Sequence, residues 1–143
     1  MKRYLITGLL MIIPLYGVSK ATEELVKSMV PYGEVSQKNG QDYLVRTKAG
    51  TKVSVEFDRT GVMDEASGYN LGMGDIFEPG NGLMALDSIA KGLKSKGHQV
   101  RGDWRLEKDS KLGWVYEIAG TRMEEPAYFI VNARNSQLIK AEE

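Results

Sequence analysis

Few side chains in this sequence have the type and spacing that catalysis requires. His98 is the only histidine and the chain has no cysteine, which removes thiol catalysis and cysteine-ligated metal sites. A histidine base needs a nucleophile within hydrogen-bond reach, and no serine elbow motif is present. His98 directly follows Gly97, where a helix cap is expected, so we predict a capping or surface role for it. A hydrolase that uses His98 or Asp58 is the remaining catalytic alternative.

Carboxylates occur as three adjacent pairs, and carboxylate oxygens are ligands for hard cations. Neighbouring residues on a strand point to opposite faces, so these pairs lack the geometry of two carboxyls facing across a cleft. We interpret them as solvated surface charge, and we predict no enzymatic activity, no metal and no cofactor. The pairs are Glu23/Glu24, Asp64/Glu65 and Glu124/Glu125.

Aromatic and charged residues alternate in the second half of the chain. Tryptophan and tyrosine are frequent in binding hot spots, so the aromatic residues either fill a core between helix and sheet or line a ligand pocket there: Trp104, Trp114, Tyr116 and Tyr128. On the strand predicted over residues 99–107, the face opposite Trp104 carries a stripe of charged residues. This stripe either sets the register of a partner or keeps the sheet soluble. This stripe is the candidate protein-binding surface: Arg101, Asp103, Arg105 and Glu107.

The elements that must position these residues occur in the same order twice. Residues 53–66 and 128–141 each contain an alternating apolar strand, a short polar turn and a short apolar pair. A helix-like segment precedes each of them, and such a repeat indicates two copies of one supersecondary unit. The predicted fold is α+β, with two repeated units, each a helix packed on a small antiparallel sheet.

Hydrophobic periodicity sets the bounds of these units. Helices are predicted over 22–30, before Pro31, and over 86–96, where apolar residues recur on one face and Gly97 follows as a C-terminal cap. Residues 67–82 contain five glycines and are predicted to be a linker, part of which packs against the protein because Ile76 and Phe77 are apolar. Alternation predicts strands at 42–48, 52–58, 99–107, 114–118 and 128–132.

The N-terminal residues have the pattern of a secretory signal peptide. Lys2 and Arg3 precede an apolar run that is short for a membrane span, and Ser19 and Ala21 form a small-x-small cleavage signature. The alternative is an uncleaved anchor. The predicted organisation is therefore a signal peptide at 1–21, a first unit at 22–66, the linker at 67–82 and a second unit at 83–143.

Cleavage after Ala21 would leave 16 basic and 19 acidic residues, a net charge of −3. This mixed, mildly acidic balance argues against nucleic acid as a partner, because phosphate binding needs a basic stripe. We expect a periplasmic or secreted protein without a stable membrane span after cleavage. The absence of cysteine means that its stability depends on buried apolar surface rather than on disulfides.

The second unit resembles the PepSY family of exported and membrane-attached bacterial proteins. The resemblance rests on an apolar helix that ends at Gly97, on the strand 114–118, and on an ending at 131–139 that is similar to the family's Val-Asp-Ala-x-Thr-Gly-x-Val-Leu. Asn132 and Ser136 replace the usual aspartate and glycine. The ending at 57–63 resembles a shortened copy of the same motif. The family also occurs in propeptides of thermolysin-like peptidases, which implies inhibition or chaperoning of an enzyme.

These observations predict an exported, non-catalytic binding module of PepSY type. We expect it to bind or inhibit an envelope or secreted protein, with a peptidase as one candidate, through the open sheet face or an edge strand. The alternative is a small-ligand or lipid carrier, with its ligand between helix and sheet near Trp104 and Trp114.

Overall fold

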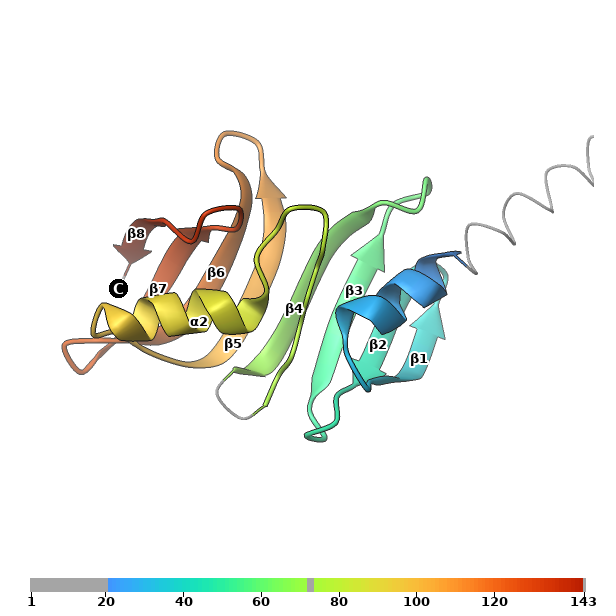
Figure 1. The fold of residues 1–143 in the computed structure, drawn as a ribbon, viewed down its shortest axis with the longest axis horizontal. Helices are drawn as coiled ribbons and strands as arrows, with labels where there is room; N and C mark the ends of the chain where they lie inside the picture. The colour runs from blue at the N-terminus through green and yellow to red at the C-terminus, as the bar shows by residue number, and fades with distance from the viewer. Residues whose placement is uncertain (1–20, 72–73, 143) are drawn as a thin grey trace, which may run out of the picture.

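The computed structural model describes residues 21–71 and 74–142. Within them, eight strands form one antiparallel sheet whose spatial order is the order along the chain. Residues 21–29 are helical, and α2 is the helix Leu86–Ser95 (Figure 1). The predicted signal peptide lies outside the described residues except for Ala21. The strands are β1 (Glu34–Asn39), β2 (Asp42–Arg46), β3 (Lys52–Phe57), β4 (Met63–Leu71), β5 (Gln99–Asp109), β6 (Gly113–Arg122), β7 (Glu125–Asn132) and β8 (Leu138–Glu142).

The prediction of two repeated units, each with its own small sheet, is wrong. Strand β4 pairs with β5 in antiparallel register, from Glu65 opposite Glu107 to Leu71 opposite Gly102. The strands before and after the connection between β4 and β5 therefore belong to one continuous sheet. Buried residues from both helical segments and from the strands of both halves also form one apolar cluster. The physical reason is that a free edge on β4 or β5 would expose unpaired backbone groups, which pairing removes.

The strands form because apolar residues alternate along them, and the alternation assigns their faces correctly. On β2 and β3, Tyr43, Val45, Val53, Val55 and Phe57 are buried. The residues between them are exposed or half-buried. Burying one face against the helices while water covers the other is typical of antiparallel sheets. The sheet is therefore two-sided, with one covered face and one helix-free face.

Helix α2 has the predicted apolar face and the predicted C-terminal cap. Leu86, Ile89, Ala90 and Leu93 are buried. The N–H of Gly97 donates to the carbonyl of Lys94, and the N–H of His98 donates to that of Leu93, which is a Schellman motif. At the other end, Ala85 supplies no side-chain cap, and the N–H of Leu86 donates to the carbonyl of Phe77 instead.

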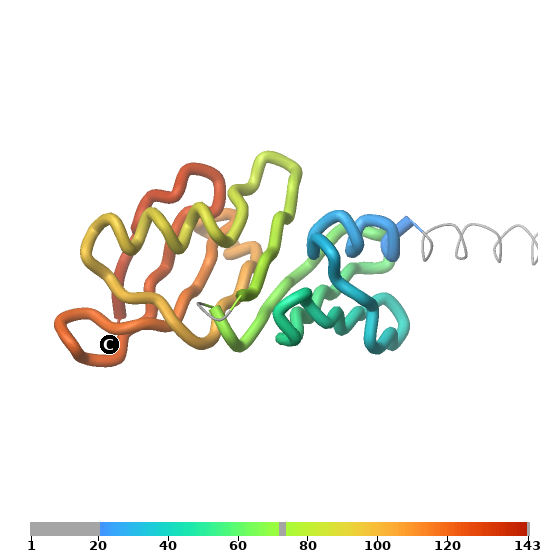
Figure 2. The backbone as a smooth tube through the Cα atoms, turned by 60° about the horizontal axis from the view of Figure 1, so that its bottom comes forward, coloured from blue at the N-terminus to red at the C-terminus, as the bar shows by residue number. Residues whose placement is uncertain are grey.

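The connection between the two halves of the sheet is part of the core. Residues 74–85 run back in front of β4 and pass between the two helical segments (Figures 1 and 2). Phe77 is buried with its ring centroid 5.1 Å from that of Trp104, whereas Ile76 is 38% exposed. The N–H of Glu78 donates to the carbonyl of Met29, at the end of the first helical segment. The prediction that part of this segment packs against the protein is therefore confirmed, and Phe77 is the residue that does so.

Asp75 joins this connection to both halves of the sheet. Its buried carboxylate accepts a 2.7 Å hydrogen bond from Trp104 Nε1 on β5 and a second from Thr51 Oγ1, before β3. A Cβ added to Gly68 on β4 would collide with Asp75 Oδ2 and with the Trp104 indole. Gly68 is therefore needed for close packing, in a segment that the sequence predicts to be a linker.

The Asp75 contacts predict a large effect of Asp75→Ala on stability. The substitution leaves the buried Trp104 N–H and the half-buried Thr51 hydroxyl without this acceptor, so we expect the free energy of unfolding to fall by about 2–4 kcal/mol. Urea denaturation followed by tryptophan fluorescence measures this loss. Glu78→Ala, at an exposed position of the same connection, is the matched control. A loss below about 0.5 kcal/mol, the range of ordinary surface substitutions, would contradict the assigned role.

Candidate protein-binding surface

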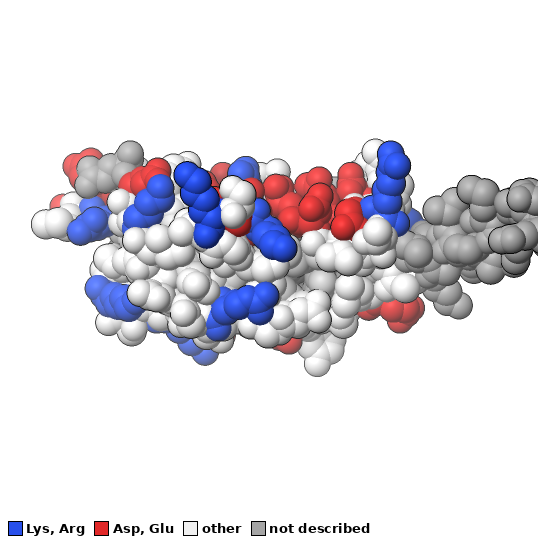
Figure 3. Space-filling view, turned by 90° about the horizontal axis from the view of Figure 1, so that it is seen from above, with Lys and Arg blue, Asp and Glu red and all other residues white. Residues whose placement is uncertain are grey.

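The helix-free face carries a row of carboxylates in direct cross-strand register. Asp42 on β2 lies opposite Glu56 on β3, Glu56 opposite Glu65 on β4, and Glu65 opposite Glu107 on β5. Neighbouring strands are about 4.8 Å apart, and like charges directly opposite each other destabilise a sheet. Among the described residues, none of these four makes an ion pair. We call them the acidic row, and Figure 3 shows acidic side chains gathered along the upper margin of the molecule.

The acidic row changes the protonation of its central member. Partial burial, and then the negative charges of Glu65, Asp42 and Asp64, raise the pKa of Glu56 above its ordinary value of 4.5, while Arg105 partly offsets them. The carboxylate repulsion at Glu56 is therefore stronger than the attraction from Arg105.

A shallow hollow of about 190 Å³ lies beside the acidic row. Tyr69 of β4 and Tyr128 of β7 border it and are 62% and 49% exposed. Asp103 and Arg105 of β5 and Glu117 of β6 also line it. We call these five residues the tyrosine trough. Arg105 lies directly opposite Glu117. The trough contains one cationic side chain, Arg105, and two anionic side chains, Asp103 and Glu117.

A second hollow, of about 210 Å³, adjoins the trough and shares Glu117 and Tyr128 with it. Val115 and Ile130 line it and are only 4% and 8% exposed, although they lie on the helix-free face. Longer side chains around them reduce their exposure, including Leu112. This part of the face therefore combines apolar groups with a charged surround, as the centres of protein interfaces do.

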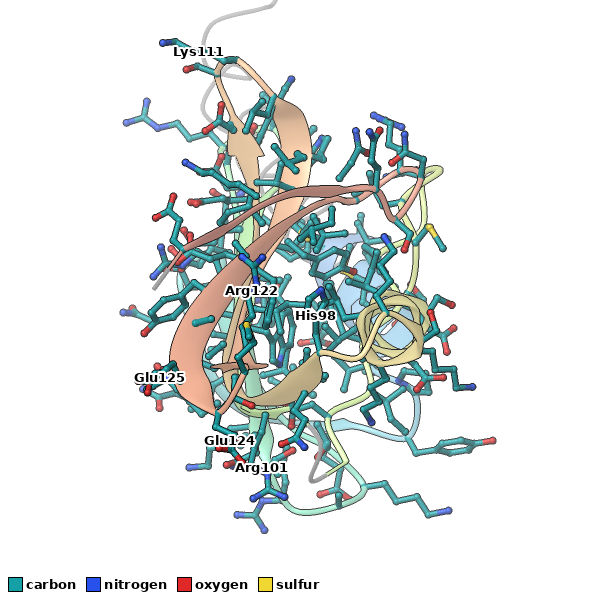
Figure 4. The ribbon with its side chains drawn as sticks, turned by 90° about the vertical axis from the view of Figure 1, so that its left-hand side faces the viewer. His98, Arg101, Lys111, Arg122, Glu124 and Glu125 are labelled. Carbon is teal, nitrogen blue, oxygen red and sulfur yellow. The ribbon has the colours of Figure 1, made fainter. Side chains whose placement is uncertain are left out.

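The structure divides the predicted charged stripe. Asp103 and Arg105 lie in the trough and Glu107 in the acidic row, but Arg101 lines another hollow beside Gly97 and Thr121. The cause is an irregularity in β5, which advances four residues from Val100 to Trp104 while β6 advances two from Gly120 to Ile118. In Figure 4, Arg101 extends away from the core at this end of the molecule.

The predicted aromatic residues also separate. Trp104 and Tyr116 are core residues, 2% and 0% exposed. The Tyr116 hydroxyl donates a 2.7 Å hydrogen bond to the carbonyl of Met84, and burial raises its pKa. Trp114 is half-buried against the same core. These buried rings offer almost no surface to a ligand between helix and sheet, and Tyr128 lies on the helix-free face.

The two residues of the hydrolase alternative have structural surroundings. Asp58 Oδ1 accepts hydrogen bonds from the N–H groups of Thr60 and Val62 and from the Thr60 hydroxyl, and these bonds lower its pKa. His98 lies with its ring centroid 4.7 Å from that of Phe129, beside α2 (Figure 4). Within residues 21–71 and 74–142, no group of three histidine, aspartate or glutamate side chains could hold a metal ion.

Comparison of the chain with protein-family models, curated proteins and solved structures finds no match. The resemblance to the PepSY family therefore stays a prediction from the sequence. In the part of the chain that the structure describes, the helices are too short or too polar to cross a membrane.

Sequence reasoning missed Tyr69 and Glu117 as members of the surface. Tyr69 falls in the segment predicted to be a linker, and Glu117 lies in the predicted strand 114–118 but not among the candidate binding residues. The sequence signal for this strand is weak, because the apolar or aromatic residues of the run 64–71 are Ala66, Tyr69 and Leu71, which do not keep a strict alternation.

The raised pKa of Glu56 predicts a pH-dependent contribution to stability. The folded protein binds the proton more tightly than the unfolded chain, so this contribution favours folding at acidic pH and is lost as pH rises from 4.5 through the raised pKa. Glu56→Gln should therefore raise stability at pH 7 by about 0.2–1 kcal/mol and flatten the dependence between pH 4 and pH 7. Urea titrations across that range measure both effects, with Glu124→Gln as the control. Equal curves for Glu56→Gln and wild type would show that the row does not repel.

Proposed function

We propose that this protein is an exported, non-catalytic binding module of PepSY type that binds or inhibits an envelope or secreted protein. A peptidase is one candidate partner. We place it in the periplasm or outside the cell, where the predicted signal peptide would deliver it. The partner would lie on the helix-free face, over the tyrosine trough.

The observation that carries this proposal is the combination of exposed aromatic rings and uncommitted charges on one face. Tyr69 and Tyr128 are 62% and 49% exposed around a hollow that Arg105 also lines. Tyrosine and arginine are the residue types that dominate the energetics of protein interfaces. Arg105 makes no ion pair among the described residues, so its guanidinium is free to contact a partner.

The rigidity of the surface supports the same function. The trough residues project from strands β4 to β7, which are joined by continuous cross-strand pairing. Their backbone positions are fixed before a partner arrives, which reduces the entropy lost on association. Buried side chains of the opposite face, including Trp104 and Tyr116, support these strands from below.

A photo-crosslinking experiment in cells tests this function. A benzophenone amino acid replaces Tyr69 in the full-length chain, and the matched control replaces Tyr32, which is 81% exposed but lies outside the trough. We expect a discrete crosslinked protein from position 69 and none from position 32. Adding Tyr128→Ala should reduce that crosslink by about tenfold, whereas Lys111→Ala, at the tip of the β5–β6 hairpin (Figure 4), should leave it unchanged.

Two outcomes would count against the function. Crosslinking to the same proteins from positions 69 and 32 would indicate non-specific encounters. Absence of any crosslink from position 69 in cells that export the protein would remove the helix-free face as a partner site.

A further inference from the structure

The charges of the helix-free face select the chemistry of its partner. The trough contains Asp103 and Glu117 against the single cation Arg105. Beyond it, the acidic row continues across β2 to β5. Lys140 lies on the same face but is held by Glu142 at 2.6 Å. Arg46 and Lys52 also lie on this face, opposite each other at the end of β2 and β3 away from Asp42 and Glu56. A partner that approaches the middle of this face therefore meets an excess of negative charge, which favours a cationic partner in both affinity and association rate.

The size and lining of the trough narrow the group that can enter it. A volume of about 190 Å³ is below the 300–1,000 Å³ that is typical of small-molecule sites. A single long side chain fits this space better. Tyrosine rings attract a cation through their faces, and carboxylates form charge-assisted hydrogen bonds with ammonium and guanidinium groups. Tyr69 and Tyr128 with Asp103 and Glu117 provide both types of contact around one hollow.

Arg105 does not satisfy both carboxylates of the trough. It lies directly opposite Glu117, and Asp103 and Glu107 are two residues away on the same face of β5. None of these carboxylates forms an ion pair with it in the described part of the chain. An incoming cation therefore has acceptors that the protein's own arginine leaves open, with Arg105 itself available to a neighbouring backbone carbonyl of the partner.

We propose that the segment of the partner protein that lies on the helix-free face is basic, and that one of its lysine or arginine side chains enters the tyrosine trough between Tyr69 and Tyr128. This inference rests on the proposed function and names the chemistry that the same surface recognises. The acidic row then faces further basic residues of the segment.

The test uses defined peptide probes with the full-length protein. Three acetylated, amidated and dye-labelled octapeptides alternate serine with lysine, glutamine or glutamate, and fluorescence anisotropy measures their binding at low and at physiological salt. We expect the lysine peptide to bind most tightly, the glutamate peptide not to bind, and the binding to weaken as salt screens the charges.

Matched variants locate the binding. Asp103→Asn combined with Glu117→Gln should weaken the lysine peptide about fivefold or more, and Tyr69→Ala should weaken it further. The control pair Asp87→Asn and Glu124→Gln removes the same charge outside the trough, and Tyr32→Ala removes a ring that is more exposed than Tyr69, 81% against 62%. Both controls should leave binding unchanged. Urea midpoints confirm that every variant is folded. Equal weakening by the trough and control pairs, or preference for the glutamate peptide, would overturn the inference.

Crosslinking from position 69 separates this inference from the function on which it rests. A crosslink that survives Asp103→Asn with Glu117→Gln would keep the partner site and reject its basic chemistry. Absence of a crosslink from position 69 when Asp103 and Glu117 are unchanged would reject the function itself, whichever peptide binds most tightly.

Discussion

The carboxylate of Asp75 must find its hydrogen-bond donors inside the protein, and much of the structure depends on how it does so. A buried acid without donors is strongly destabilising, and here the donors come from Trp104 on β5 and from Thr51, before β3. The residue therefore fixes the connection over β4 and holds it against both halves of the sheet. Phe77 fills the adjacent space, so the two helical segments and the connection together cover one face without a break in the core.

This arrangement leaves the other face with a different physical character. All the covering elements lie on one side, so long charged side chains occupy the second side and compete for few counter-charges. The acidic row places four carboxylates opposite one another on adjacent strands. Its cost is tolerated because the apolar cluster beneath includes large buried side chains such as Trp104, Tyr43 and Tyr116. Binding of a cationic partner would relieve this repulsion between the carboxylates of the acidic row.

The sequence predicts the local features of the fold well and its assembly poorly. Alternation identifies which side of β2, β3 and β5 is buried, because each side chain reports its own surroundings. The pairing of β4 with β5 has no local signal, since the two strands are separated by the connection and Gly68 reads as a flexible residue. Tyr69 was missed for the same reason, because it lies in the part of β4 that the sequence predicts to be a linker. Arg101, Asp103 and Arg105 were predicted as one stripe, but the irregularity near Gly102 depends on the neighbouring strand, which periodicity within β5 does not report.

The order of the strands also bears on how the chain reaches this structure. Every strand pairs with its neighbour in the sequence, and six of the seven pairings are closed by short turns. Such contacts form early because little chain entropy is lost in closing them. The pairing of β4 with β5 is the exception, since helix α2 lies between these two strands in the sequence. Two meanders of locally paired strands are thus joined by one long-range pairing, and the residues between them supply Asp75 and Phe77 to the core beside it.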